Sequence, residues 1–424
     1  MWKNYFDLIK LAIGNRASIT KELSHSDWLG FFEFCKKQAL SGIGFTAVEK
    51  LHTNGIICPS DLRMKWMAMA FQIEKQNTKL NNQCRTLSQK LIHDGFSTCI
   101  LKGQGNLLNY PEELKLRRNP GDIDIWAVPK YGCNKGEEDG GIKIAEQIGK
   151  DNIEYITYNG NRAVIEYVKM QHRLAGNKGK PDMRILHIEA PQIEGTPVEV
   201  HFRPAFTRSP IRFLRMDRWF KNHTDECMKN YTNMGFAVPT ASINVVYQMT
   251  HVFTHYLDEG LGLRQLMDYY FALRVWHNDV MECKDLQSQG MWSEGLGTPV
   301  MSKEEVMAVL RSFGMAKFAA AVMFVLHEAF ENEECRMKNE ECQCQPWMIC
   351  EPNEKEGKKL LAEIMQGGNF GQYDTRDAAL KKGGMIKHGL WKLKRVMRLV
   401  SSYPEEALWE PVFRVYHLFW RIAH

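Results

Sequence analysis

Apolar side chains recur at helical spacing through the first 95 residues of the chain, beginning with Phe6, Ile9 and Ile13. The stretch from Met64 to Leu91 is a long, strongly helical pattern, and Gly95 follows it as a helix stop. No residue in this part carries obvious chemistry. We therefore predict an N-terminal helical region over residues 1–95 that packs on the rest of the protein.

Short β-rich runs dominate residues 96–222, which we predict to form the core. The runs are rich in β-branched side chains and bounded by turn residues. They cover residues 98–101, 123–128, 153–158, 163–168, 185–188 and 198–202. Residues 142–148 are predicted to form a helix between these strands, and residues 131–141 form a loop by composition.

Residues 223–424 return to a helical pattern. One helix is expected after the capping pair at 239–240, another from Leu263, and helical structure again over residues 301–330. On the first of these helices His251 and His255 are one turn apart, as in a zinc protease motif. That motif needs a glutamate where Val252 stands, so the zinc protease reading is excluded.

The end of the chain is basic and aromatic. Segment 381–398 contains several lysine and arginine residues and no acidic residue, and it is followed by Trp409, Phe413, Tyr416, Phe419 and Trp420. Such an end fits a weak contact with an anionic surface, either a membrane or RNA. It equally fits terminal helices that pack their aromatic side chains inward, and we favour the packed helices.

Paired carboxylates mark the place where chemistry can be argued. Residues 122–128 read as a strand entered from the turn at Pro120-Gly121, so Asp122 and Asp124 project from the same face. Carboxylates this close repel each other, and a hard divalent cation relieves the repulsion. Alone, the pair also fits a solvated strand end.

A third carboxylate supports the metal interpretation. Residues 198–203 alternate apolar and polar side chains, which places Glu199, His201 and Arg203 together on one face of a second strand. If the two strands are neighbours in one sheet, Glu199 is available to the same metal centre as the first two carboxylates.

A glycine turn precedes these strands. The apolar run 97–101 ends in Lys102-Gly103-Gln104-Gly105 and leads into another apolar segment. A strand, a glycine turn and a helix start together offer backbone N–H groups to phosphate, and Lys102 adds a positive charge. The spacing is neither that of a Walker P-loop nor that of a dinucleotide-binding fingerprint.

Taken together, these motifs resemble a poorly characterised bacterial nucleotidyltransferase family of the polymerase-β-like superfamily. The resemblance rests on Leu-Lys-Gly at 101–103, Tyr-Pro at 110–111, Arg-x-x-Gly-Asp-Ile-Asp at 118–124 and Val-Glu-Val-His-Phe at 198–202, and it covers roughly residues 70–275. It implies an α/β (α+β) fold, with a small mixed sheet between N- and C-terminal helical regions.

The resemblance also implies roles for individual residues. Asp122, Asp124 and Glu199 match the metal-binding carboxylates of the superfamily, and Gly103 matches its phosphate-side turn. Two departures stand out. Gln104 replaces the usual serine, whose hydroxyl would touch phosphate, and a long insertion separates the second strand from the first.

The expected reaction moves a nucleoside monophosphate from an NTP to an acceptor hydroxyl and releases pyrophosphate. Asp122, Asp124 and Glu199 are the expected catalytic and metal-binding residues, with Mg²⁺ or Mn²⁺ as the cofactor. The candidates for holding the nucleotide are Lys102, Gly103, Gln104 and Arg118.

Several alternatives stay open. The acceptor can be a small molecule, a sugar intermediate, a protein side chain or an RNA end. A catalytically silent nucleotide-binding scaffold fits the missing serine. A metal-dependent glycosyltransferase also uses Asp-x-Asp, but it places that motif after a nucleotide-binding α/β half, which this chain does not show.

Two side chains near the core have two interpretations each. Arg264 stands one turn before Asp268, so it forms either an ion pair within the helix or a guanidinium that faces phosphate. His187 lies just before the Glu199 strand and is expected to be a hydrogen-bonded structural histidine, with a place at the site as the alternative.

Composition fits an ordinary soluble globular protein, with 44% hydrophobic and 25% charged residues and a formal net charge of +5. This mildly basic balance suits anionic ligands. No uncharged apolar stretch of about 18 residues appears, and charge interrupts the start of the chain where a signal peptide would be apolar, so we expect a cytoplasmic location.

Cysteine usage points the same way, because 11 cysteines is an odd number that suits a reducing compartment. Cys335, Cys342, Cys344 and Cys350 lie together in a polar stretch. They form either a structural zinc site or a loop with incidental thiols. The spacing lacks the paired knuckles typical of zinc, which favours the loop.

Overall fold

The computed structural model describes residues 2–20, 22–130, 141–148, 152–177, 179–288, 300–331, 345–376 and 384–423. Most of the loop predicted at 131–141 and the cysteines at 335, 342 and 344 therefore lie outside the described residues. Cys350 is half-buried, and its thiol is not in a disulfide.

The N-terminal helical prediction is confirmed. Four helices form this part: α1 (Trp2–Ala12), α2 (His25–Lys37), α3 (Ser41–Thr53) and α4 (Ser60–His93). The Ser24 side chain caps α2 through a reciprocal bond with Asp27. Gly95, with a φ of 95°, follows α4 in the left-handed region that lets the chain turn into the first strand.

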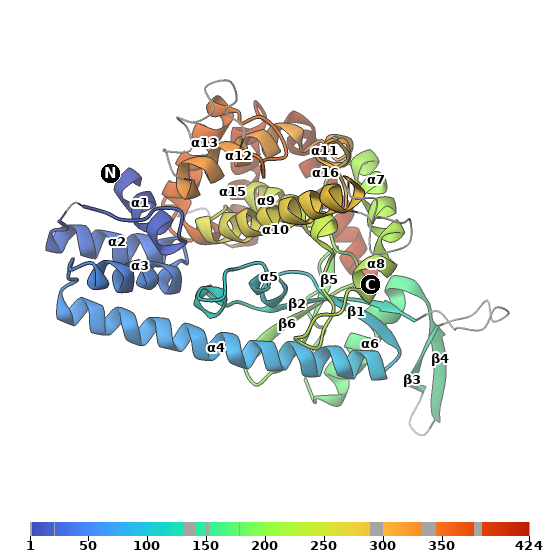
Figure 1. Ribbon diagram of the computed structural model, residues 1–424. Coiled ribbons are helices and arrows are strands. Elements are labelled where there is room, and N and C mark those ends of the chain that lie inside the picture. Colours follow the sequence, from blue (N-terminus) through green and yellow to red (C-terminus); the bar gives the residue numbers. More distant parts are fainter. Residues whose placement is uncertain are drawn as a thin grey trace.

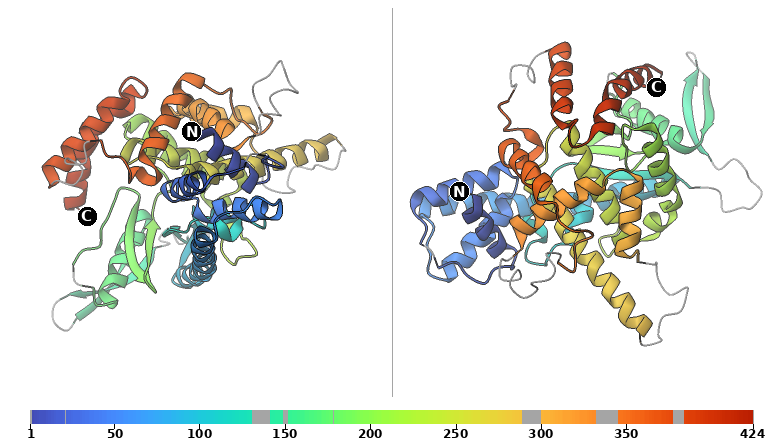
Figure 2. Two further views of the ribbon diagram at one scale, coloured as in Figure 1. Left: turned by 90° about the vertical axis from the view of Figure 1, so that its left-hand side faces the viewer. Right: turned by 90° about the horizontal axis from the view of Figure 1, so that it is seen from above.

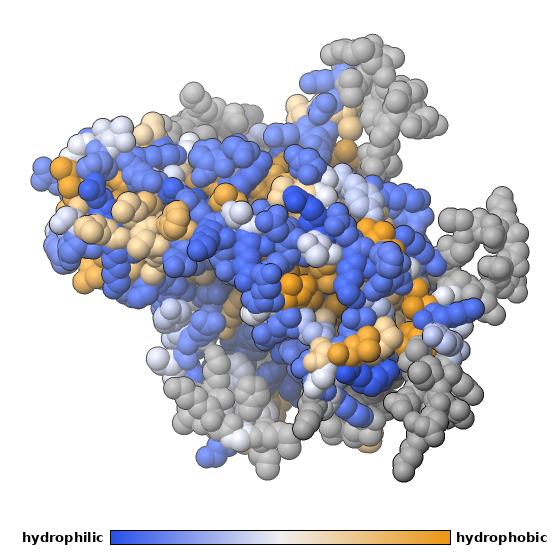
Figure 3. Space-filling view, turned by 90° about the horizontal axis from the view of Figure 1, so that it is seen from below, coloured by the Kyte–Doolittle hydropathy of each residue, from blue (hydrophilic) through white to orange (hydrophobic). Residues whose placement is uncertain are grey.

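The two halves of helix α4 lie in different surroundings. Its side chains Leu80, Cys84 and Leu87 pack on the sheet. Nearer its start, Met64, Met67 and Phe71 are each more than half exposed, and an apolar patch lies there on the lower face of the molecule (Figure 3). Only the C-terminal half of α4 thus belongs to the core of the sheet.

A small mixed sheet lies between α4 below and helices α9 (Ala241–Asp258) and α10 (Leu263–Ser288) above (Figure 1). Its strand order is β1-β2-β6-β5. The strands are β1 (Phe96–Ile100), β2 (Ile123–Pro129), β5 (His187–Ile193) and β6 (Thr196–His201). The β2 and β6 strands are parallel neighbours, while β1 and β5 join them as antiparallel edges.

One face of the sheet is apolar and is covered by α4 and α6 (Gly160–Leu174). Ile123 and Ile125 of β2 and Val198 and Val200 of β6 are buried there, as the alternation of the two strands requires. The polar residues between them face the opposite side. The fold class predicted from the sequence, a small mixed sheet flanked by helices, is confirmed.

Two secondary-structure predictions are wrong. Residues 142–148 form a strand, β3 (Ile142–Ile148), which pairs along its whole length with β4 (Asn152–Tyr158) in a separate two-stranded sheet. Residues 163–168 belong to helix α6. The β-branched residues of that run suggested a strand, but it lies in the middle of a 15-residue helix whose buried side chains include Val164, Ile165 and Val168.

The remaining strand runs were placed correctly, although β5 begins two residues later than the run at 185–188. Short elements link the strands to the rest: α5 (Gln104–Leu107) and the 3₁₀ turn η1 (Lys115–Arg117). They lie in the connection between β1 and β2, which is the connection that carries the predicted glycine turn.

The C-terminal half is helical, as predicted. Its helices besides α9 and α10 are α7 (Pro210–Asn222), α8 (Thr224–Lys229), α11 (Lys303–Ser312), α12 (Ala316–Phe330), α13 (Glu354–Gly367), α15 (Met385–Leu399) and α16 (Pro404–Ala423), with the 3₁₀ turn η3 (Asn369–Gly371). One hydrophobic core joins α1–α4 to α9–α13. The division at residues 95 and 222 stays a prediction, because this core crosses it.

Helices α15 and α16 contact each other at one side of the molecule (Figure 2). The pair is packed in part, because Trp391 is 3% exposed and the buried Arg395 donates to the backbone carbonyls of Tyr256 and Leu257. Tyr416 and Phe419 of α16 are more than half exposed, so the predicted inward packing is wrong for these two aromatic side chains. Arg395 therefore holds the fold together and is not part of a surface charge. A weak contact between segment 381–398 and an anionic surface stays a prediction, and residues 381–383 lie outside the described part.

Buried ion pairs fasten α16 to the rest of the protein. Arg208, just before α7, is buried against Glu410 of α16 and Asp258 of α9. Glu406 accepts from the Thr207 hydroxyl at 2.6 Å. Within the described residues, no helix is long and apolar enough to cross a membrane.

Replacing Glu410 with alanine is expected to lower the free energy of unfolding by about 3 kcal/mol, because it leaves the Arg208 guanidinium buried beside a single carboxylate. Glu405→Ala is the control, since Glu405 is 40% exposed and pairs with Arg212 at the surface; its loss should cost less than about 1 kcal/mol. Urea denaturation measures both. Equal costs would mean that α16 is not fastened through this buried pair.

Candidate active site

The pairing of β2 with β6 brings the predicted carboxylates together. Asp124 and Glu199 are Cα partners in this parallel pair, and Asp122 lies one residue before β2. Each residue offers one carboxylate oxygen, and these oxygens lie within 4.8 Å of one another. The condition stated from the sequence, that the two strands be neighbours in one sheet, is confirmed.

Two cationic side chains lie against Asp124, which is 1% exposed. The Lys102 Nζ is 3.0 Å from its Oδ1, and the His201 Nε2 is also 3.0 Å from that oxygen. The other oxygen, Oδ2, is buried and has no hydrogen-bond partner among the described residues. A buried carboxylate oxygen without a partner is costly. This orphaned oxygen beside Asp122 and Glu199 fits a divalent cation.

The charges of this group are strongly coupled. Burial lowers the pKa of His201, but its hydrogen bonds to Asp124 and Glu199 outweigh burial and raise the pKa to about 9. Burial raises the pKa of Glu199, yet His201 and Lys102 lower it to about 2. Lys102 is also held above its ordinary pKa, because Asp124 and Asp122 outweigh the effect of burial. The site without a metal is thus a network of charged groups that neutralise each other.

His187 also lies at the site, against the structural role that the sequence favoured. Its Nδ1 is 3.2 Å from the Glu199 Oε2, and its ring lies 5.0 Å from that of His201 between centroids. Neither ring nitrogen makes a hydrogen bond to a described residue. Burial, followed by the neighbouring His201, lowers the pKa of His187 to about 2, so the imidazole is neutral.

The glycine turn approaches the carboxylates closely. Gly103 has φ 62° and ψ −107°, a conformation open to glycine and strained for other residues. A Cβ on this residue would stand 3.5 Å from the carbonyl oxygen of Asp122, so the strain comes from the backbone angles and not from crowding. The Leu101 N–H donates to the Asp124 carbonyl at 3.0 Å and ties the turn to β2.

The side chain of Gln104 points away from the site. Its amide donates to Asn81 Oδ1 at 2.7 Å and to the Asn77 carbonyl at 3.2 Å, both on α4. Gln104 therefore holds the turn against α4. Only the backbone of Gln104 is then free to contact a nucleotide. Helix α5 is four residues long, so the helix dipole adds little to phosphate binding.

Arg118 is occupied by a buried ion pair. Its guanidinium binds both oxygens of Asp268 at 2.7 and 2.8 Å, and Tyr110 donates to the same carboxylate at 2.7 Å. The ion pair between Arg264 and Asp268, one of the two interpretations of Arg264, therefore does not form. The Asp268 carboxylate binds Arg118 instead. A pair 150 positions apart in the sequence leaves no local signal.

Arg264 also lines this wall, and no carboxylate of a described residue lies at ion-pair distance from its guanidinium. It is 8% exposed, its Nη1 donates to the Asn119 carbonyl at 3.2 Å, and its guanidinium lies over the Phe370 ring. Burial and the neighbouring Arg118 lower the pKa of Arg264 to about 10. A buried cation of this kind attracts an anion, which supports the phosphate-facing interpretation.

The carboxylates open into a cavity of about 950 Å³. Lys102, Gly103, Arg118 and Arg264 line it on the side of the turn. Its far wall comes from α9, α15 and α16, through side chains that include His251, His255, Trp391, Lys392, Phe413 and Arg414. Gln104 does not line it. The C-terminal helices thus complete the cavity, although no sequence motif marks them.

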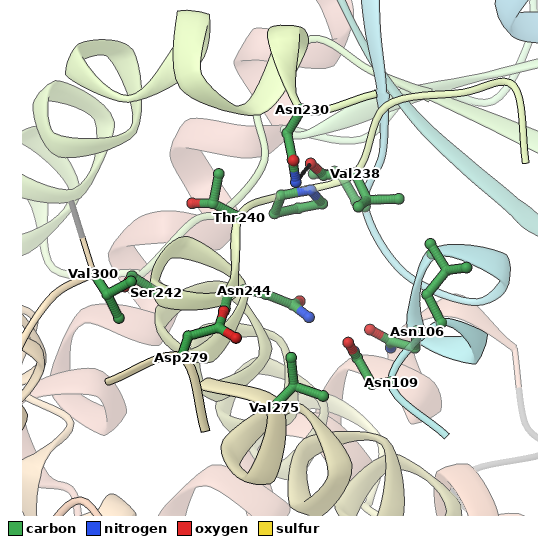
Figure 4. A pocket seen from close by; sticks show the side chains of 15 residues that line it. Asn106, Asn109, Asn230, Val238, Thr240, Ser242, Asn244, Val275, Asp279 and Val300 are labelled. Carbon is green, nitrogen blue, oxygen red and sulfur yellow. Dashed lines mark hydrogen bonds between the residues drawn. The ribbon is translucent and has the colours of Figure 1, made fainter. Parts of the chain in front are cut away.

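A second cavity of about 290 Å³ lies on the other side of the glycine turn (Figure 4). Its polar lining is mainly of amide groups, with Asn106, Asn109 and Asn244 pointing toward its centre. Asn106 lines both cavities. None of the three carboxylates lines this smaller cavity, so the chemistry belongs to the larger one.

Comparison with known proteins gives one match. A family model described as an uncharacterised nucleotidyltransferase matches residues 24–290. This range contains the three carboxylates, the glycine turn, Arg118, Arg264 and Asp268. It also contains α9, but it ends before α15 and α16, the other two helices of the far wall. No curated protein and no solved structure matches the chain.

Methionine at position 118 is expected to lower the free energy of unfolding by about 3–5 kcal/mol, because Arg118→Met leaves the Asp268 carboxylate buried without its cation. Arg264→Met is the matched variant. Burial and Arg118 already disfavour the Arg264 charge, so its loss should change stability by less than about 1 kcal/mol. Thermal and denaturant unfolding measure both variants. A larger loss from Arg264→Met would make Arg264 the structural residue of the two.

Proposed function

We propose, since this chain belongs to the uncharacterised nucleotidyltransferase family, that its larger cavity transfers a nucleoside monophosphate from an NTP to an acceptor hydroxyl. The observation that carries the proposal is the placement of Asp122, Asp124 and Glu199 on adjoining strands, with ligand oxygens within 4.8 Å of one another. In this reaction the acceptor oxygen bonds to the α-phosphorus, the bond to the β-phosphate breaks, and pyrophosphate leaves.

The carboxylates are proposed to hold Mg²⁺ or Mn²⁺. A bound divalent cation supplies charge neutralisation for the phosphate oxygens and acidifies the attacking hydroxyl. The Asp124 oxygen that has no partner supports this role for the described residues. Lys102 and His201 offset the carboxylate charge where no cation is bound, so the site stays folded between turnovers.

Phosphate is proposed to be held by Lys102, the Gly103 turn and Arg264. All three line the cavity beside the carboxylates. Arg264 takes the place that the sequence gave to Arg118, because Arg118 is paired with Asp268 while Arg264 keeps its charge facing the cavity. Arg118 is then a positioning residue, since it fixes α10 and with it Arg264.

Glu199 is proposed to act on the acceptor side. Its carboxylate either binds the metal that activates the acceptor hydroxyl or takes the proton that this hydroxyl loses. His187 from β5 and His201 from β6 both contact the Glu199 carboxylate.

A catalytically silent nucleotide-binding scaffold is the second candidate. It is favoured by Gln104, whose side chain bonds to α4 and offers no hydroxyl to phosphate. The two functions differ in one product. Incubation of the full chain with each α-labelled NTP, Mg²⁺ or Mn²⁺ and fractions of cell extract should transfer label to an acceptor and release pyrophosphate. Nucleotide binding without pyrophosphate in any fraction supports the scaffold.

Glu199→Gln is expected to keep NTP affinity within about threefold while turnover falls by a factor on the order of 10² to 10⁴, because a group on the acceptor side contributes mainly to the transition state. Calorimetry and pyrophosphate release on the same preparations separate the two effects. Asp124→Asn is the comparison, and it should lose metal-dependent NTP binding and turnover together. If Glu199→Gln loses both as well, Glu199 is a ligand of the nucleotide-bound metal.

A further inference from the structure

A second ligand set shares Glu199 with the carboxylate group. The strands β5 and β6 are antiparallel, and His187 and His201 are Cα partners in that pair. Glu199 lies two residues before His201, so the side chains of both project from the same face of β6. His187, Glu199 and His201 each offer a ligand atom, and these atoms lie within 4.8 Å of one another.

The distances fit a coordinated ion. Two ligands bound at about 2.0–2.2 Å to a tetrahedral zinc ion stand about 3.4 Å apart. The Glu199 Oε2 lies 3.2 Å from the His187 Nδ1 and 3.6 Å from the His201 Nε2. The two rings meet edge to face, 61° apart, with their centroids 5.0 Å from each other. An ion between the three groups needs only small shifts of their side chains.

The state of His187 points to a missing partner. The residue is 7% exposed, and neither of its ring nitrogens has a hydrogen-bond partner among the described residues. The His187 Nδ1 lies at hydrogen-bond distance from the Glu199 Oε2, but the angles do not allow a hydrogen bond between them. Buried imidazole nitrogens are normally paired, and a metal ion satisfies one of them as a proton donor would.

We propose that His187, Glu199 and His201 bind one transition metal ion of the Zn²⁺ and Co²⁺ class, separate from the ion of the nucleotide. Two imidazoles and one carboxylate are ligands that such ions prefer, whereas Mg²⁺ prefers oxygen alone. When the ion binds, the His201 imidazole releases its proton to solvent and exchanges its contact with Asp124 for the metal. The Asp124 oxygen is then released to the nucleotide side of the site. The inference rests on the proposed function for the shared use of Glu199, but binding of the ion itself does not require turnover.

The proposal is tested with Co²⁺ alone on the full chain, without nucleotide. A visible absorption band should appear on binding and should disappear when Zn²⁺ is added, while millimolar Mg²⁺ leaves it unchanged. His187→Gln should weaken Co²⁺ binding at least tenfold. Asp122→Asn should stay within threefold of the wild type, because Asp122 does not belong to this ligand set.

His172→Gln is the matched control. His172 is a half-buried histidine of α6 whose Nε2 contacts the Glu189 carbonyl, so its replacement removes an imidazole away from the site. It should leave Co²⁺ affinity unchanged. Equal Co²⁺ affinity in His187→Gln and the wild type, or an equal loss in His172→Gln, overturns the proposal.

A measurement on the wild type covers the case in which His187→Gln does not fold. X-ray absorption of the Zn²⁺-loaded protein should show two imidazoles and oxygen in the first shell, and a shell dominated by sulfur would assign the ion to cysteines and overturn the proposal. The two proposals fail separately. If the protein releases pyrophosphate with Mg²⁺ but His187→Gln binds Co²⁺ as the wild type does, only the proposal of a second metal is overturned. If the wild type binds Co²⁺ as expected but never releases pyrophosphate, only the proposed transferase function is overturned.

Discussion

The parallel pairing of β2 with β6 is the constraint on which the site depends. It places Asp124 opposite Glu199 in the sheet, with one carboxylate buried and the other partly so. Like charges at this distance oppose folding unless cations lie between them. Lys102 and His201 meet that need within the chain itself, at 3.0 Å from the Asp124 Oδ1. The protein can therefore fold with the carboxylates assembled before a metal or a nucleotide arrives.

A second constraint fixes the wall opposite the sheet. The Arg118 guanidinium and the Tyr110 hydroxyl bind Asp268, which ties the connection between β1 and β2 to α10. This buried pair sets the position of Arg264 one turn earlier on the same helix. Arg264 is buried, and no carboxylate of a described residue lies at ion-pair distance from it. Its guanidinium therefore places a positive charge beside the cavity. Arg118 of the sequence motif therefore stabilises the fold, whereas Arg264 of α10 faces the cavity.

Local patterns predicted the parts of the site that lie on single strands. Asp122, Asp124 and Glu199 were found because alternation along a strand fixes the face of each side chain. The run at 163–168 misled because β-branched residues occur in helices whose packing outweighs propensity. The partners of Arg118 and His187 depend on contacts between distant segments and on strand register. A sequence shows neither, so the pairing of Arg118 with Asp268 came only from the structure, and the structure decided between the two interpretations of His187.

The most direct test of the central claim is anomalous diffraction from crystals of the full chain with Mn²⁺ and an NTP whose α,β-bridging oxygen is replaced by methylene. We expect an Mn²⁺ peak at about 2.0–2.2 Å from oxygens of Asp122 and Asp124, the usual bond length for small divalent cations. The α-phosphorus should lie beside that peak, on the side of Glu199. A nucleotide bound elsewhere, or one bound in the cavity with no metal on these two carboxylates, would contradict it.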